Sequence, residues 1–228
     1  MLTKETVQFF RELRENNHKD WFDLNRKRYD AVRADYLSLT TTILEKMKRQ
    51  DPSFDFLTPK ECQFRINRDV RFSKNKAPYK TNLAMIFAPN GKKMHGGSYY
   101  LHLEEGQSMV GGGMYMPEAP LLKKVRTEIH YFYDDFTKII NKSGFKKTYG
   151  GVDIDDKILL KRAPKGFEET DPAIEYLKLK SYTAIKKFDD AMITSPELVP
   201  FVVETLSHLK DFVSFINRAI ASNEDGGI

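Results

Sequence analysis

Apolar positions at the start of the chain recur with a helical period. This pattern predicts a first helix that ends at Asn16-Asn17, and a longer helix from about residue 20 to residue 47. The turn signal Asp51-Pro52-Ser53 follows the second helix. The apolar residues of the first helix are Val7, Phe9, Phe10 and Leu13. The residues of the second expected to face the core are Trp21, Phe22, Leu24, Tyr29, Val32, Tyr36, Leu39, Ile43 and Leu44.

The middle of the chain changes to short runs of strand-forming residues. Glu105-Gly106, between the last two runs, is a hairpin signal. Because the runs follow one another closely, we expect an antiparallel meander and not strand–helix–strand units. The predicted strands are 61–66, 81–89, 98–104 and 108–116.

Helical and strand patterns alternate in the second half. Pro117 opens a predicted helix that reaches residue 140, and Gly144 is expected to be its C-terminal glycine. Two short strands are predicted at 145–150 and 157–163. Asp171-Pro172 and Ser195-Pro196 are typical of helix starts, so helices are expected to begin near residues 172 and 196.

These patterns together predict an α+β fold. We expect an antiparallel sheet of four or more strands with helices packed around it. Residues 1–221 are expected to form a single α+β domain, and the polar tail 222–228 is expected to be disordered.

The cysteine content suits a reducing compartment. The one cysteine, Cys62, excludes an internal disulfide, and its place in a predicted strand favours a buried, inert thiol. No run approaches the roughly 18 apolar residues that a membrane helix needs. The first residues become charged too soon for a secretory signal. We therefore expect a cytoplasmic protein without a membrane segment.

The positive charge is concentrated in one segment. Residues 60–93 contain nine Lys/Arg and two Asp/Glu, whereas the rest of the chain has 28 basic and 30 acidic residues. Such a concentration raises the local potential and attracts anions. The alternative is a lysine-rich face that is merely solvated.

Arg68 is the unusual member of this segment. On an extended strand it falls on the same side as the apolar residues around it, where an unpaired charge is too costly to bury. Arg68 must therefore be paired, or the strand must break at 67–69, where Asn67 and Asp69 favour a turn.

Residue types in the segment 65–80 favour binding of an anion. Arginine presents a rigid fork of donors that fits phosphate or carboxylate. The candidate ligand-binding residues are Arg65, Arg68, Arg71, Lys74, Lys76, Tyr79 and Lys80. A purely structural alternative is a set of salt bridges to Asp23, Asp30 or Asp35 on the long helix.

Two function classes remain open beside that structural alternative. The first is a pocket for a small phosphorylated or carboxylated ligand, which could be an active site. The second is a nucleic-acid interface in which the basic segment contacts phosphates and Tyr79, Tyr99 or Tyr100 stacks on bases. Because arginines tied to an aspartate suit fixed geometry more than diffuse attraction, the pocket is favoured.

Candidate catalytic chemistry is sparse. If the protein is an enzyme, Asp69 is the first candidate for a general base, with the arginines stabilising negative charge. The five histidines lack metal-ligand spacing, so no metal site is predicted, and His102 is taken as an ordinary strand residue. No cofactor can be assigned.

Three consecutive glycines form a second candidate element. Gly111, Gly112 and Gly113 precede the helix expected at Pro117, and Gly112 and Gly113 would let the backbone approach an anion. Their spacing matches no nucleotide-binding loop. Close packing against a neighbouring helix is the slightly favoured alternative.

The basic segment resembles the signature of an uncharacterised bacterial family, domain of unknown function 2461. The matching positions are Arg65-x-x-Arg68-Asp69-x-Arg71-Phe72-x-x-Asn75-Lys76-x-x-Tyr79. Residues 9–22, 111–126 and 159–167 also resemble this family, so the similarity spans essentially the whole chain. It implies no established activity or cofactor.

Overall fold

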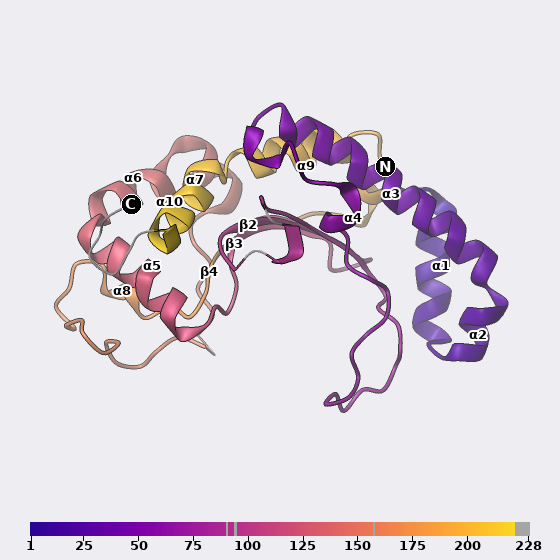
Figure 1. Ribbon diagram of the computed structural model, residues 1–228, viewed down its shortest axis with the longest axis horizontal. Coiled ribbons are helices and arrows are strands. Elements are labelled where there is room, and N and C mark those ends of the chain that lie inside the picture. The colour runs from indigo at the N-terminus through magenta and orange to yellow at the C-terminus, as the bar shows by residue number, and fades with distance from the viewer. Residues whose placement is uncertain (90, 94, 157, 222–228) are drawn as a thin grey trace. The chain divides into compact units, whose positions relative to one another are not determined.

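The protein contains helices and one antiparallel sheet, which confirms the predicted α+β class (Figure 1). The computed structural model describes residues 1–89, 91–93, 95–156 and 158–221. The four strands are neighbours in sequence order, as a meander requires. They are β1 (Leu83–Phe87), β2 (Ser98–Leu103), β3 (Met109–Met114) and β4 (Tyr182–Lys187).

Contacts along the chain define two compact units. The first takes its residues from 1–93, 100–110 and 187–204, and the second from 94–99, 111–186 and 205–228. The single domain expected over residues 1–221 stays a prediction. The tail 222–228, expected to be disordered, lies outside the described residues.

The first helix forms where its periodicity predicts it. Helix α1 (Lys4–Glu15) begins after Thr3, whose hydroxyl accepts the Thr6 N–H, and it ends at Asn16. The longer predicted helix is instead two helices, α2 (Lys19–Leu24) and α3 (Arg26–Lys48). The Asn25 side chain donates to the Trp21 carbonyl at 2.9 Å, and this local bond competes with helix continuation. Leu24, predicted to face the core, is 87% exposed at this break.

The prediction of a strand at 61–66 is wrong. Residues Pro59–Cys62 form a helical turn, α4, because Thr58 and Glu61 make a reciprocal capping box and Pro59 is at its first position. The chain beyond α4 is extended, with isolated antiparallel bridges from Gln63 to Met85 and from Asn67 to Tyr79. Two short 3₁₀ turns flank this region, η1 (Pro52–Phe54) and η2 (Gly91–Lys93).

Aromatic side chains form part of the core of the first unit. The Phe22 and Tyr79 rings stack with centroids 4.1 Å apart, and Phe22 also contacts Tyr29 at 4.9 Å. The Asn17 side chain donates to the Tyr79 carbonyl at 2.9 Å and accepts the Tyr79 N–H at 3.0 Å. These contacts fix Tyr79, near the end of the basic segment, against α2 and Asn17.

The second half departs further from the sequence predictions. The predicted helix at 117–140 is divided at Phe132, and the predicted strand at 145–150 is helical. Gly150, with φ 77°, ends that helix, a role expected of Gly144, which lies within it. Residues 158–163 form no strand, and Lys157 lies outside the described residues. The helices are α5 (Ala119–Tyr131), α6 (Tyr133–Asn141), α7 (Ser143–Tyr149), α8 (Ile174–Leu177), α9 (Leu198–Ser207) and α10 (Lys210–Ala221), with the 3₁₀ turn η3 (Asp190–Thr194).

Candidate functional site

Residues 68–77 form a loop that Arg68 holds closed. The Arg68 N–H donates to the Pro78 carbonyl at 2.9 Å, next to the Asn67–Tyr79 bridge at the base of the loop. Its guanidinium donates to the Ala77 carbonyl at 2.8 Å and to the Ser73 hydroxyl at 3.5 Å. Arg68 is half-buried, and the strand pattern does break at this point. The Arg68 guanidinium therefore makes its hydrogen bonds within the loop.

Three other charged residues of the loop, Asp69, Arg71 and Lys76, also bond within it. The Arg71 guanidinium makes a two-pronged ion pair with Asp69, with Nε–Oδ1 at 3.0 Å and Nη2–Oδ2 at 2.7 Å. Lys76 donates to the Val70 carbonyl at 3.0 Å. Lys74 is exposed. The loop thus presents a cationic surface whose arginines do not converge on one point.

Asp69, the candidate general base, lies on the exposed surface of this loop. The hydrogen bond from Arg71 lowers the pKa of its carboxyl group, with a smaller contribution from the Arg71 N–H. A lower pKa makes the carboxylate a weaker base. The ion pair of Asp69 with Arg71 suits a role in holding the shape of the loop.

Arg65 lies before the loop and faces a groove of about 620 Å³, which we call the cationic groove. Its walls come from α2, α3, residues 60–67, Tyr79 and Lys92. The basic side chains lining it are Arg26, Arg33, Lys60, Arg65 and Lys92, and the acidic ones are Asp23 and Asp30. The positive charge on its walls therefore exceeds the negative charge.

The acidic residues of the cationic groove do not neutralise Arg65. Asp23 pairs with Lys19, and Asp30 lies 3.9 Å from Arg26 and 4.0 Å from Arg33. Within the described part of the chain, Arg65 has no carboxylate within ion-pair distance. An exposed guanidinium beside other cations is suited to an external anion.

The pKa of Lys80 reflects the same excess of positive charge. Its Nζ lies 5.3 Å from the centroid of the Phe64 ring. Burial lowers the pKa of the Lys80 ammonium, and the charges of Arg65 and Lys92 lower it further. Like charges thus face one another around Arg65, which favours a counter-ion.

The wall on the α3 side is fixed by hydrogen bonds. The Tyr36 hydroxyl donates to the Ala84 carbonyl and accepts the Phe64 N–H. The Gln63 side chain donates to the Thr40 hydroxyl at 2.8 Å. These bonds tie residues 63–64 and β1 to α3, so the position of Arg65 relative to the α3 arginines is set by packed elements.

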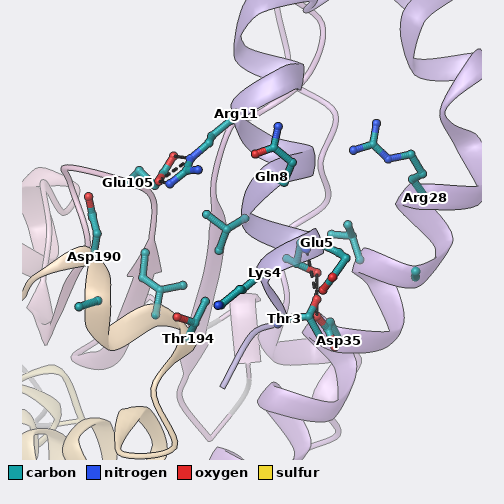
Figure 2. A pocket seen from close by; sticks show the side chains of 16 residues that line it. Thr3, Lys4, Glu5, Gln8, Arg11, Arg28, Asp35, Glu105, Asp190 and Thr194 are labelled. Atoms are coloured by element: carbon teal, nitrogen blue, oxygen red, sulfur yellow. Dashed lines mark hydrogen bonds and ion pairs between the residues drawn. The ribbon is translucent and has the colours of Figure 1, made fainter.

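A larger pocket, of about 880 Å³, has a different charge pattern (Figure 2). Arg11 pairs with Glu105, and Asp35 accepts the Thr3 N–H at 2.9 Å and its hydroxyl at 2.6 Å. The carboxylates that line the pocket are Glu5, Asp35, Glu105 and Asp190, and the basic residues are Lys4, Arg11 and Arg28. Because this lining is slightly acidic, the smaller groove is the better anion site.

The glycines of β3 serve strand packing. A Cβ at Gly112 would lie 2.3 Å from the Ser98 carbonyl oxygen and one at Gly113 2.0 Å from that of Tyr182. Gly113 also has φ 114°, which side-chain-bearing residues rarely adopt. The close neighbours are mainly strand backbones, where a helix was expected. Gly112 and Gly113 belong to the second unit, whereas Arg65 belongs to the first.

The ligand-binding residues predicted from the sequence lie in different places in the structure. Arg65 and Lys80 come together near Tyr79, while Asp69, Arg71, Lys74 and Lys76 lie on the loop. Arg26 and Arg33 were missed, although their spacing of seven residues places them on one face of α3. Lys60 and Lys92 were counted in the basic segment but not assigned to a site.

Other site types find little support in the described ranges. No group of three His, Cys, Asp or Glu residues there could hold a metal ion. Cys62 is buried, as predicted, and burial raises the pKa of its thiol to about 12. No helix of these ranges has the length and apolar character required to cross a membrane.

Comparison with known proteins shows the family of the chain. The family model described as "Conserved hypothetical protein (DUF2461)" matches residues 5–215. The chain belongs to this family, as its sequence signature indicated. Searches of curated proteins and of solved structures found no match.

Proposed function

We propose that this protein binds a small phosphorylated or carboxylated ligand in the cationic groove, with Arg65 as the central contact. The observation that carries the proposal is the exposed Arg65 guanidinium, which faces the groove without a carboxylate partner in the described ranges. A volume of about 620 Å³ falls within the range of small-molecule sites.

The groove offers different contacts to different parts of a ligand. Arg65 can hold a phosphate or carboxylate through two parallel hydrogen bonds. Arg26 and Arg33 line the groove from α3, and each shares Asp30 at the limit of ion-pair distance. The half-buried ring of Tyr29 provides an apolar surface beside these charges. A ligand with an anionic group and an apolar or planar portion would use both surfaces.

Nucleic-acid binding is less favoured by the positions of the aromatic residues. Tyr79 is 8% exposed and Tyr99 is 5% exposed, so neither presents a face on which a base could stack. Of the three tyrosines considered from the sequence, only Tyr100 is partly accessible. The loop cations remain available for phosphates, and salt dependence separates the two functions.

A thermal-shift panel tests the class of ligand. The probes are inorganic phosphate, sulfate, citrate, nucleotides, sugar phosphates and short DNA and RNA, each at low and high salt. A ligand present at about 100 times its Kd stabilises the folded state by about 2.7 kcal/mol, which raises the melting temperature. We expect a salt-resistant shift with a small anion that is lost in Arg65→Gln. Shifts with polymers alone, fading as salt rises, would reject the pocket in favour of nucleic-acid binding.

A further inference from the structure

Three polar side chains lie in series along one face of β2 and the residue that follows it. Tyr100, His102 and Glu104 alternate with Tyr99, Leu101 and Leu103, which are buried. Because side chains on a strand alternate between its faces, the polar three point together to the more accessible side. Their side chains remain only slightly exposed, at 13% for His102 and 12% for Glu104.

These side chains are joined by hydrogen bonds. The Tyr100 hydroxyl lies 3.2 Å from His102 Nδ1, and His102 Nε2 lies 3.1 Å from Glu104 Oε2. A carboxylate only accepts hydrogen bonds, so the neutral imidazole carries its proton on Nε2. His102 Nδ1 is then the acceptor, and the Tyr100 hydroxyl donates to it.

The carboxylate of Glu104 is itself held in place. The Thr81 hydroxyl donates to Glu104 Oε1 at 2.7 Å, and an Arg14 guanidinium nitrogen lies 3.9 Å from the same oxygen. Each imidazole nitrogen is therefore engaged, and the series ends at the Tyr100 hydroxyl. A polar series of this kind is costly to bury unless every member is satisfied.

We propose that Tyr100 is an acid–base group for a substrate bearing a hydroxyl, with His102 and Glu104 as its positioning residues. The substrate hydroxyl gives its proton to the Tyr100 oxygen while the Tyr100 proton passes to His102 Nδ1. The substrate becomes an alkoxide, the imidazole becomes an imidazolium, and Glu104 stabilises that new positive charge. The reverse transfer restores the starting state, so no other reactant is needed.

The surroundings of Tyr100 favour this relay over a free phenolate. Burial raises the pKa of the Tyr100 hydroxyl, and the charge of Glu104 raises it further. The hydroxyl therefore keeps its proton until His102 accepts it. Arg14 and Tyr36 are further titratable groups near the relay, the first beside Glu104 and the second with its own pKa raised by burial and in part by the charge of Tyr100. This activity goes beyond anion binding and does not depend on the cationic groove.

A second histidine–carboxylate pair provides a control within the same chain. His130 Nδ1 contacts Asp171 Oδ2, and the Tyr131 ring lies 4.9 Å from the imidazole in an edge-on arrangement. Tyr131 is 73% exposed, far more than a half-buried tyrosine such as Tyr100. No hydrogen bond from the Tyr131 hydroxyl to His130 is present in the described structure. Exposure alone thus predicts faster modification of Tyr131, and the relay predicts faster modification of Tyr100.

Sulfonylation by phenylmethanesulfonyl fluoride tests the relay without knowledge of the substrate. The tyrosine oxygen bonds to sulfur, fluoride leaves, and the phenol proton passes to the neighbouring base. Mass spectrometry of tryptic peptides then gives the rate at each tyrosine of the folded protein. We expect Tyr100 to react at least tenfold faster than Tyr131.

Two variants separate a relay from a structural role. Glu104→Gln keeps the shape of the side chain but removes its charge, and His102→Gln removes the base. We expect each to slow the reaction of Tyr100 about tenfold or more while the rate at Tyr131 is unchanged, and an unchanged melting temperature confirms an intact fold. His130→Gln, the matched control, should leave Tyr100 unaffected. Equal rates at Tyr100 and Tyr131 in the wild type, or an unchanged Tyr100 rate in Glu104→Gln, would overturn the proposal.

Discussion

Replacement of Arg68 by alanine should open the basic loop without unfolding the protein. The guanidinium donates to the Ala77 carbonyl at 2.8 Å and, more weakly, to the Ser73 hydroxyl at 3.5 Å. A hydrogen bond from a charged group contributes about 1.5–3 kcal/mol, so we take about 2 kcal/mol as the loss. At about 1.4 kcal/mol per tenfold change, the population with an open loop rises about 30-fold.

Limited proteolysis with trypsin measures this population directly. The cleavage sites after Arg71, Lys74 and Lys76 lie inside the loop and are unchanged by the substitution. When opening is fast relative to cleavage, the cleavage rate follows the open population, so we expect about 30-fold faster nicking within residues 71–76.

The control for this experiment is Arg65→Ala. It removes the same charge from the same segment but no bond that closes the loop, so nicking should stay at the wild-type rate. A rise of less than about threefold in the cleavage rate of Arg68→Ala would be well below the effect of a charged hydrogen bond. It would refute the role of Arg68 in holding the loop closed. Equal rises in both variants would show that net charge, and not the Ala77 contact, controls the loop.

Two further predictions concern stability. Gly113→Ala should lower the free energy of unfolding, measured by chemical denaturation, by about 1–3 kcal/mol. The added Cβ would lie 2.0 Å from the Tyr182 carbonyl oxygen, and φ at this position is 114°. An unchanged free energy of unfolding would contradict the packing role. Hydrogen bonds from Arg28 and Gln8 lower the pKa of Glu12 from 4.5 to about 2, so its stabilisation is complete above pH 4.5 and disappears as the pH falls towards about 2. Since this pair is partly exposed, Glu12→Gln should cost under about 1 kcal/mol at pH 7 and progressively less below pH 4.5. A difference from wild type that grows on acidification would show the opposite sign of linkage.

Periodicity predicted the elements whose apolar spacing is long or whose turns are distinctive. Helix α1 and the β2–β3 hairpin follow from such signals, and β1 lies inside its predicted run. At residues 59–62 the local chemistry of Thr58, Pro59 and Glu61 outweighed the apolar alternation that suggested a strand. Strand β4 was missed because its six residues carry only a weak alternating pattern before two exposed lysines.

The candidate site was harder to predict than the fold because its residues are distant in sequence. Arg65, Arg68 and Arg71 recur every three residues. The guanidinium of Arg68, however, donates to a carbonyl oxygen of the loop, and that of Arg71 pairs with Asp69. Arg65 alone of these three lines the cationic groove. Arg26 and Arg33, which line the same groove, lie 39 and 32 residues earlier in the chain, and only the packing of α3 beside residues 60–67 brings them near Arg65.

We propose that Arg65 binds an anion at a defined place and not through general positive charge. Calorimetric titration of the anion selected by the thermal-shift panel tests it on wild type, Arg65→Gln and Arg71→Gln. Both variants lose one arginine charge, but Arg71 bonds Asp69 on the exposed loop and does not line the groove. Loss of a charged, two-pronged contact worth about 1.5–3 kcal/mol should weaken Kd about 10- to 100-fold in Arg65→Gln. Arg71→Gln should keep the wild-type Kd; equal weakening in both variants would contradict binding at a defined place.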